Sequence, residues 1–209
     1  QLTETQAHYF RHYAPAKQRA ESASIWIPYC KRFPKDASAA ASFVYNATDY
    51  SPPEVRQEAA LRLLAIPATQ YSADLCRRLF VAADSNKNAD LAKRVYAWML
   101  AARKTVAVVD PTYSAFFGDI LWKYKAAAEA NAVWTAGLTL NVNNYEAQEC
   151  ARRLLVRKKG PERVAFIKQL LAADSDFHGR YATWLANEQM VAGDLAGFEQ
   201  TLVQTRERQ

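Results

Sequence analysis

The sequence predicts an all-α fold: an α-solenoid of about four to five helical hairpins over residues 37–209, behind an N-terminal helical arm over residues 1–36. Three observations predict it. The 209 residues include 39 Ala but only 6 Gly and 8 Pro, and Ala loses no side-chain entropy in a helix. Apolar residues recur at helical spacing, without a convincing alternation of apolar and polar residues. Breakers and caps divide the chain into paired segments of about 12 to 16 residues.

The N-terminal part differs from the rest of the chain. Residues 3–19 and 20–33 follow helical patterns, but Pro15 and Pro28 fall inside them. Terminal units of a repeat array differ from its middle, because one of their faces meets solvent. We therefore expect an arm that caps the array.

Two helices are predicted next, each from its cap. Residues 51–66 form the first, with Ser51 as N-cap, proline in the first turn and Pro67 as the stop. Ser72 is the predicted N-cap of the second helix, which ends at about Asp84.

A third helix is predicted over residues 89–104, followed by an extended connector over residues 105–109. Its apolar side chains recur along one face, which we expect to be buried. They are Leu91, Val95, Trp98, Met99 and Ala102.

The C-terminal half repeats this pattern of helix and break. Asp110, Pro111 and Thr112 open a helix, the asparagines at 141–144 mark a break, and Gly160 is a predicted C-terminal cap. The remaining helices are predicted over residues 126–134, 145–158, 161 onward, 177–191 and 195–205.

An internal repeat supports the hairpin architecture. Residues 71–80 align with residues 145–155, since both read Tyr-x-Ala-x-x-Cys and then Arg-Arg-Leu after a one-residue slip. The offset corresponds to about two units of the length of a helical hairpin. Each hairpin is too small to bury its own apolar face, so we expect neighbours to cover it.

Residues 92–99, Ala-Lys-Arg-Val-Tyr-Ala-Trp-Met, together with residues 110–117, Asp-Pro-Thr-Tyr-Ser-Ala-Phe-Phe, resemble the pentatricopeptide repeat. Tetratricopeptide-type hairpins are the close alternative. The resemblance implies stacked helical hairpins and, in most members of the family, binding of single-stranded RNA with one base per hairpin.

In that family, the residue after the Tyr of the first helix contributes to reading a base. Ser114 has this position and suits it, whereas the corresponding residues elsewhere are Ser72, Glu146 and Ala182. A carboxylate and a methyl group give no general pattern for reading bases. The resemblance therefore favours a scaffold, with RNA binding as the alternative.

The chain is basic, with 27 Lys and Arg against 21 Asp and Glu, a net charge of +6. This bias favours anionic partners, which include nucleic acid and acidic protein surfaces. Helix-dipole complementarity accounts for part of the clustering. The predicted partner contacts are Arg77, Arg78, Arg152, Arg153, Arg157, Lys158 and Lys159.

Catalytic, metal-binding and cofactor-binding motifs are not found, so we expect a protein that is not an enzyme and holds no cofactor. His8 and His12 are four residues apart, but no third ligand accompanies them. The cysteines Cys30, Cys76 and Cys150 have helical core spacing, and no glycine-rich phosphate loop occurs. No apolar segment approaches the roughly 18 to 20 residues that span a bilayer.

These observations predict a non-catalytic structural subunit of a larger protein complex. A small basic protein of this type resembles the pentatricopeptide-like accessory subunit of euglenozoan mitochondrial F1-ATPase, which implies a peripheral subunit of the F1Fo ATP synthase docked on its catalytic head. The alternatives are an RNA-binding pentatricopeptide protein and a bacterial periplasmic helical-repeat assembly protein. The start at Gln1, without an initiator Met, suggests a removed presequence or a truncated chain, and it does not separate a mitochondrial presequence from a secretory one. The odd number of cysteines and the basic charge favour the mitochondrial matrix over the periplasm.

Overall fold

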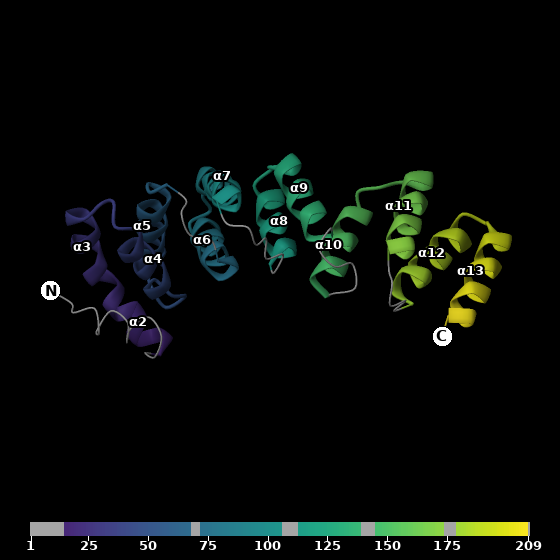
Figure 1. The fold of residues 1–209 in the computed structure, drawn as a ribbon, viewed down its shortest axis with the longest axis horizontal. Helices are drawn as coiled ribbons and strands as arrows, with labels where there is room; N and C mark the ends of the chain where they lie inside the picture. The colour runs from purple at the N-terminus through teal and green to yellow at the C-terminus, as the bar shows by residue number, and fades with distance from the viewer. Residues whose placement is uncertain (1–14, 68–71, 106–112, 139–144, 174–178, 209) are drawn as a thin grey trace. The chain divides into compact units, whose positions relative to one another are not determined.

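The computed structural model describes residues 15–67, 72–105, 113–138, 145–173 and 179–208 (Figure 1). Over these residues the chain forms twelve α-helices and one short 3-10 helix, without a β-strand. The prediction of an all-α fold is confirmed. Contacts divide the chain into two compact units, Gln1–Asp110 with Asp119–Glu129 (unit 1) and Pro111–Gly118 with Ala130–Gln209 (unit 2), and each is described by itself.

Unit 1 begins with short helices whose positions follow the prolines. Pro15 is the N-cap of α2 (Ala16–Ser22), which is followed by η1 (Ala23–Ile25) and α3 (Trp26–Arg32). Pro28 lies in the first turn of α3, where its missing N–H breaks no helical hydrogen bond. The prolines therefore mark where helices start, and the long segment predicted over residues 20–33 is divided.

Two pairs of helices follow in unit 1, and Figure 1 shows them side by side. The helix α4 packs on α5, α6 packs on α7, and α5 also contacts α6, so that each pair covers part of the next. Their bounds are Ala37–Asn46 for α4, Pro53–Leu64 for α5, Ala73–Ser85 for α6 and Ala89–Thr105 for α7.

The N-caps of α5 and α6 were both predicted from the sequence. Ser72 is the N-cap of α6, as predicted, and its Oγ accepts the Leu75 N–H at 3.1 Å. Ser51 was predicted to cap α5, which is wrong: Pro52 is the N-cap and Pro53 begins the helix. The fixed φ of proline already suits a first turn, so the side chain of Ser51 is buried in the preceding loop instead.

The predicted apolar stripe of α7 is confirmed, because all five of its side chains are buried. Trp98 is 8% exposed, and its Nε1 donates to the carbonyl oxygen of Ile66 at 3.3 Å. Thr105 ends α7, although the sequence analysis assigned it to the connector. Residues 106–109 of that connector lie outside the described residues.

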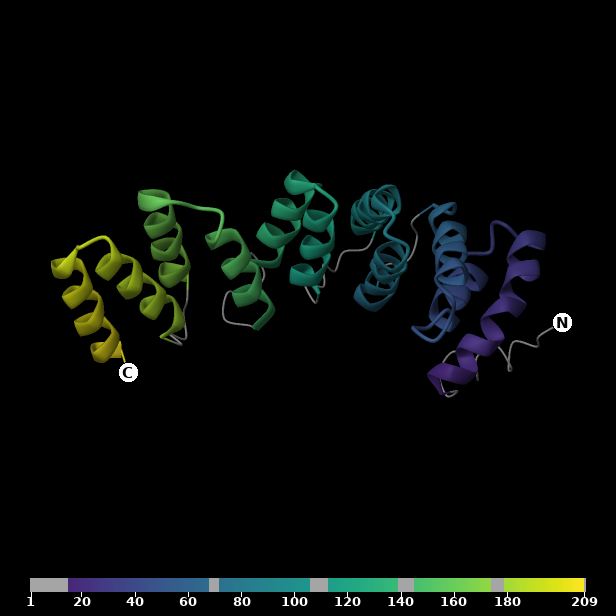
Figure 2. The same cartoon turned by 180° about the vertical axis from the view of Figure 1, so that it is seen from behind.

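Unit 2 continues with helices in the same pairwise order, and Figure 2 shows α10 to α13 from behind. The helix α11 packs on α10 and on α12, and α12 packs on α13. The division between the units falls within α8 and α9. The bounds are Ser114–Lys123 for α8, Ala127–Leu138 for α9, Tyr145–Leu155 for α10, Gly160–Ala173 for α11, Arg180–Val191 for α12 and Leu195–Arg208 for α13.

Two helix boundaries in unit 2 differ from the prediction. The helix α10 stops at Leu155, whereas the sequence predicted a helix to residue 158. Gly160, the predicted C-terminal cap, is instead the first residue of α11, with a φ of 48° that favours glycine. The segments at 110–112 and 141–144 lie outside the described residues.

The start of α8 is capped by another helix. Glu146 of α10 accepts the backbone N–H of Ala115 through its Oε1 at 2.6 Å, while Tyr113 has a φ of 71° and precedes the helix. A carboxylate at this end also interacts favourably with the helix dipole. Tertiary packing therefore supplies part of the cap of α8.

Candidate anion-binding pocket

The arginine pair of α6 is held by one acidic residue. The Nε of Arg77 lies 3.3 Å from Oδ1 of Asp74, and the Nε of Arg78 lies 2.9 Å from its Oδ2. Burial raises the pKa of the Asp74 carboxyl, but the hydrogen bonds and charges of the two arginines outweigh it and hold that pKa below its usual value. Asp74 is therefore ionised at neutral pH.

The arginine pair of α10 has the same local arrangement. The carboxylate of Glu149 lies 3.1 Å from Arg152 and 2.6 Å from Arg153, three and four residues further on. The hydrogen bond from Arg153 lowers the pKa of Glu149. The two segments of the internal repeat thus share an ion-paired arginine pair next to a buried cysteine.

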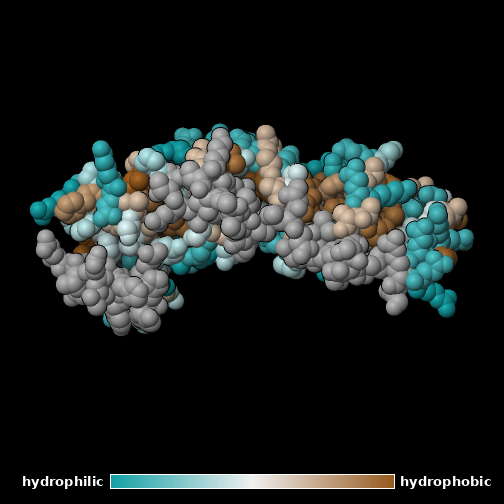
Figure 3. Space-filling model, viewed as in Figure 1, coloured by the Kyte–Doolittle hydropathy of each residue, from teal (hydrophilic) through white to brown (hydrophobic). Residues whose placement is uncertain are grey.

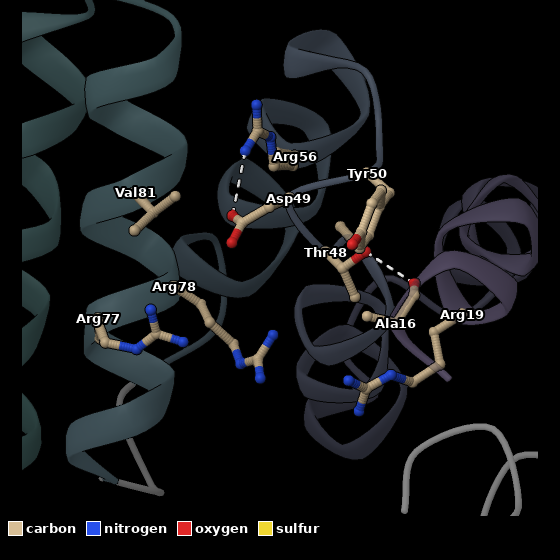
Figure 4. Close-up of a pocket in the computed structure, with 10 residues that line it drawn as sticks. Ala16, Arg19, Thr48, Asp49, Tyr50, Arg56, Arg77, Arg78 and Val81 are labelled. Carbon is tan, nitrogen blue, oxygen red and sulfur yellow. Dashed lines mark hydrogen bonds and ion pairs between the residues drawn. The ribbon is translucent and has the colours of Figure 1, made fainter. Parts of the chain in front are cut away.

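What surrounds the two pairs is different. Arg77 and Arg78 line a pocket of about 130 Å³ in unit 1, which Arg19 and Arg56 also line (Figure 4). Arg152, by contrast, is 61% exposed. The pocket therefore lies beside the first segment of the internal repeat. The similar sequence of the second segment does not predict it. Its other polar lining residues are Thr48, Asp49 and Tyr50.

Three helices and one loop position these groups. Arg19 comes from α2 and Arg56 from α5, while the α4–α5 loop lies between them. The Oγ1 of Thr48 in this loop donates to the carbonyl oxygen of Ala16 at 2.9 Å. This bond fixes the first turn of α2 against the loop and so directs Arg19 toward the pocket.

The electrostatics of the pocket are dominated by cations. Burial lowers the pKa of Arg19, and the nearby charge of Arg78 lowers it further. Among the described residues that line the pocket, Asp49 supplies the one carboxylate, which is 79% exposed and lies 3.4 Å from Arg56. Guanidinium groups in this setting favour an anion, because the low dielectric of a partly buried site strengthens their attraction.

The basic residues predicted on and after α10 fall into a different environment. Arg157 stacks on the indole of Trp134, with its Cζ 4.1 Å from the ring centroid, and Lys158 pairs with Glu162 at 2.6 Å. Lys159 is exposed. Most of this cluster thus has structural partners, and none of it is among the residues that line the pocket of unit 1.

The four positions that correspond to base-reading residues are occupied by packing and capping. Ser114 is buried with 1% exposure, and Ala182 is buried as well. Ser72 caps α6 while its Oγ also lies 3.0 Å from the hydroxyl of Tyr45, and Glu146 caps α8. Ser114 and Ala182 are thus buried, whereas Ser72 and Glu146 are half-exposed and form contacts between helices.

The cysteines are in the core, as the sequence analysis expected. All three are buried, and burial raises the pKa of the Cys30 thiol to about 11. Within the described residues no three His, Cys, Asp or Glu side chains form a metal-binding group. The histidines at 8, 12 and 178 lie outside those residues.

We expect the three thiols of the native protein to resist a thiol reagent such as iodoacetamide at mildly alkaline pH. A buried thiol reacts only after local opening, so labelling should be on the order of 100-fold slower than in denaturant. Time-resolved mass spectrometry counts the labelled sites. Rapid labelling of any one cysteine in the native protein contradicts the packing described here.

Sequence reasoning missed Arg19 and Arg56. Neither belongs to a cluster of basic residues like those after Cys76 and Cys150, and both are far in sequence from Arg77. The nearest signal is the pair of cations Lys17 and Arg19 on α2, which by itself indicates only an exposed helix.

Comparison with protein-family models, with curated proteins and with solved structures found no match. Among the helices that the structure describes, none has the length and apolar character needed to cross a membrane.

Proposed function

We propose that this protein is a non-catalytic scaffold subunit that binds an acidic partner protein within a larger assembly. The observation that carries this proposal is the gathering of four arginines from three helices around one pocket of unit 1. Arginine binds carboxylate and phosphate groups through several hydrogen bonds at once, and it is enriched at the energetic centres of protein interfaces.

The chemistry of the pocket suits binding rather than proton transfer. Guanidinium groups stay protonated at any physiological pH, so they donate hydrogen bonds but do not act as bases. The hydroxyl of Thr48 is already engaged with Ala16, and the thiols of the chain are buried in its core. These groups can hold and orient an anionic segment.

Exposed apolar side chains support a role in protein contacts. The helices α12 and α13 expose five of them, and Figure 3 shows hydrophobic surface among hydrophilic atoms over α11 to α13. Exposed apolar residues gathered on neighbouring helices are typical of interaction surfaces. They are Met190, Val191, Leu195, Leu202 and Val203.

For the architecture, we propose that the helix pairs α4–α5, α6–α7, α8–α9, α10–α11 and α12–α13 form a solenoid of the pentatricopeptide or tetratricopeptide type. The contacts of α5 with α6 in unit 1 and of α11 with α12 in unit 2 support it, because each joins one pair to the next. The resemblance noted above makes the catalytic head of mitochondrial F1Fo ATP synthase the first assembly to test.

The test is purification of the protein from its native source at about 150 mM salt, followed by size-exclusion chromatography and mass spectrometry. We expect a stoichiometric protein complex that resists nuclease. The double variant Arg56→Gln and Arg78→Gln should weaken that complex, whereas the matched variant Arg152→Gln and Arg153→Gln should retain it. Recovery of RNA without a protein partner, with binding that falls steeply as salt rises, would contradict the scaffold role.

A further inference from the structure

The helix α13 of unit 2 has one face packed on α12 and another face that is exposed. Figures 1 and 2 show α12 beside α13. On the packed face Thr201 is buried, and its Oγ1 donates to Oε1 of Gln189 in α12 at 2.8 Å. On the other face Leu202 and Val203 are 48% and 56% exposed. Two adjacent apolar side chains of α13 therefore meet solvent.

Two opposite charges flank these apolar side chains along the helix. The spacing i, i+3, i+4 and i+7 places four exposed side chains on one face, here called the α13 face: Glu199, Leu202, Val203 and Arg206. The two charges are about 10 Å apart along the helix axis, too far for an ion pair within the helix. Among the described residues neither takes part in an ion pair with another helix.

The order of these four groups makes the α13 face complementary to itself. When two copies of α13 cross antiparallel about a two-fold axis, Leu202 of one copy faces Val203 of the other. Each Glu199 then faces Arg206 of the second copy, about 5 Å along the helix from the axis. A parallel pair would bring like charges together, and these repel each other. The charges therefore favour a single orientation.

We propose that the α13 face joins two copies of this chain in a symmetric antiparallel dimer. A two-fold axis makes both copies use the same surface, so the contact closes at two copies. The apolar pair lies at the centre and the ion pairs lie at the rim, which is the usual order in protein interfaces. The α13 face belongs to unit 2, so the proposal does not depend on the arginine pocket of unit 1.

The charges select a second copy over other classes of partner. A uniformly acidic surface, such as RNA or an anionic membrane, attracts Arg206 but repels Glu199, and a uniformly basic surface does the opposite. A second copy of α13 satisfies both charges with groups that the chain already carries. It also covers the two apolar side chains in the same contact.

The small size of the α13 face limits the affinity. A stable interface buries roughly 800 Å² on each partner, contributed by about 20 residues or more. The α13 face supplies four side chains of one helix, and exposed ion pairs add little to affinity. We therefore expect a reversible dimer with a dissociation constant on the order of 100 µM.

The first experiment measures the mass of the full chain by sedimentation equilibrium at about 150 mM salt. Between about 5 and 500 µM protein, we expect a reversible shift from the monomer toward twice its mass. A chain that stays monomeric at about 500 µM would overturn the proposal. Growth beyond a dimer would also overturn it, because a two-fold contact is closed.

The second experiment reverses the charges one at a time. Glu199→Arg and Arg206→Glu each place like charges opposite each other twice in the dimer, so each should weaken self-association at least about tenfold. An equimolar mixture of the two variants should associate within about threefold of the natural affinity, because every facing pair in the mixed dimer is again opposite in charge. Fluorescence anisotropy with one variant labelled measures the mixed dimer.

The mixture keeps the test independent of any loss of stability in a single variant. Neither variant associates with itself, yet each supplies the charge that the other lacks. A mixture that fails to associate, while the natural chain dimerises, would refute the proposed register.

The third experiment tests the apolar centre of the α13 face. Val203→Gln should weaken the dimer at least about tenfold, because it places a polar group in the covered centre. Val156→Gln is the matched control, since Val156 is 69% exposed and lies just after α10, and it should change the affinity less than about twofold. Circular dichroism confirms that each variant is folded. Equal losses in both variants, or no loss in either, would place the contact elsewhere and contradict the assignment.

The outcomes also distinguish this proposal from the proposed function. A chain that dimerises through the α13 face but has no stable partner protein keeps the dimer and loses the scaffold role. A stable complex that contains a chain unable to pair with itself does the reverse.

Discussion

Replacing Trp98 by alanine is expected to lower the free energy of unfolding by about 3 to 5 kcal/mol. Trp98 is 8% exposed in the middle of the apolar face of α7, and its Nε1 donates to Ile66 at 3.3 Å. The substitution removes the largest side chain of that face and leaves a cavity between α7 and the end of α5. Urea unfolding, followed by far-UV circular dichroism, measures the change.

A matched control comes from a second tryptophan. Trp122 on α8 is 43% exposed, so Trp122→Ala should cost less than about 1 kcal/mol. Trp98→Phe should cost less than Trp98→Ala, since most of the buried area is retained. A loss under about 1 kcal/mol for Trp98→Ala would mean that the apolar face of α7 meets solvent and that the packing of this pair is wrong.

Replacing Gly118 by alanine is expected to destabilise unit 2 by about 2 to 3 kcal/mol, although alanine is the better helix former by about 1 kcal/mol. Gly118 lies on α8 where the indole of Trp134 crosses it. A Cβ at this position would lie 2.5 Å from Cε2 and 2.6 Å from Cδ1 of that ring. The ring is fully buried and its Nε1 donates to Ala115 at 3.2 Å, so it cannot move aside cheaply.

A double-mutant cycle tests this steric cause. Trp134→Phe alone should destabilise through lost packing and a lost hydrogen bond. In the Trp134→Phe background, however, Gly118→Ala should cost at least about 1 kcal/mol less than in the natural protein. An additive result, or a Gly118→Ala protein as stable as the natural one, would show that α8 and α9 do not approach this closely.

The helices themselves were largely predictable, because their signals are local. Ser72 and the apolar spacing of residues 89–104 placed α6 and α7 nearly residue by residue, since a cap and a helical period depend only on near neighbours. Helix ends at which neighbouring sequence signals compete were predicted less accurately. Pro52 replaced Ser51 as a cap, and α10 ended at Leu155 before the basic segment that follows it.

The candidate site was predictable only in part. The pairing of arginines with an acid three and four residues earlier follows from helix geometry, and Arg77 and Arg78 were singled out as partner contacts. Nothing local distinguishes them from Arg152 and Arg153, which have the same ion-pair pattern without the pocket. The difference comes from α2 and the α4–α5 loop, which pack beside the arginine pair of α6 in unit 1.

The sequence by itself determined that this chain is helical, where most of its helices begin, and which face of α7 is buried, because these properties follow from caps and spacing within a few turns. Only the tertiary structure decided that Arg19 and Arg56 join Arg77 and Arg78. Residues so far apart along the chain meet through the packing of whole helices, and the bond from Thr48 to Ala16 that fixes α2 in place has no counterpart in any local pattern.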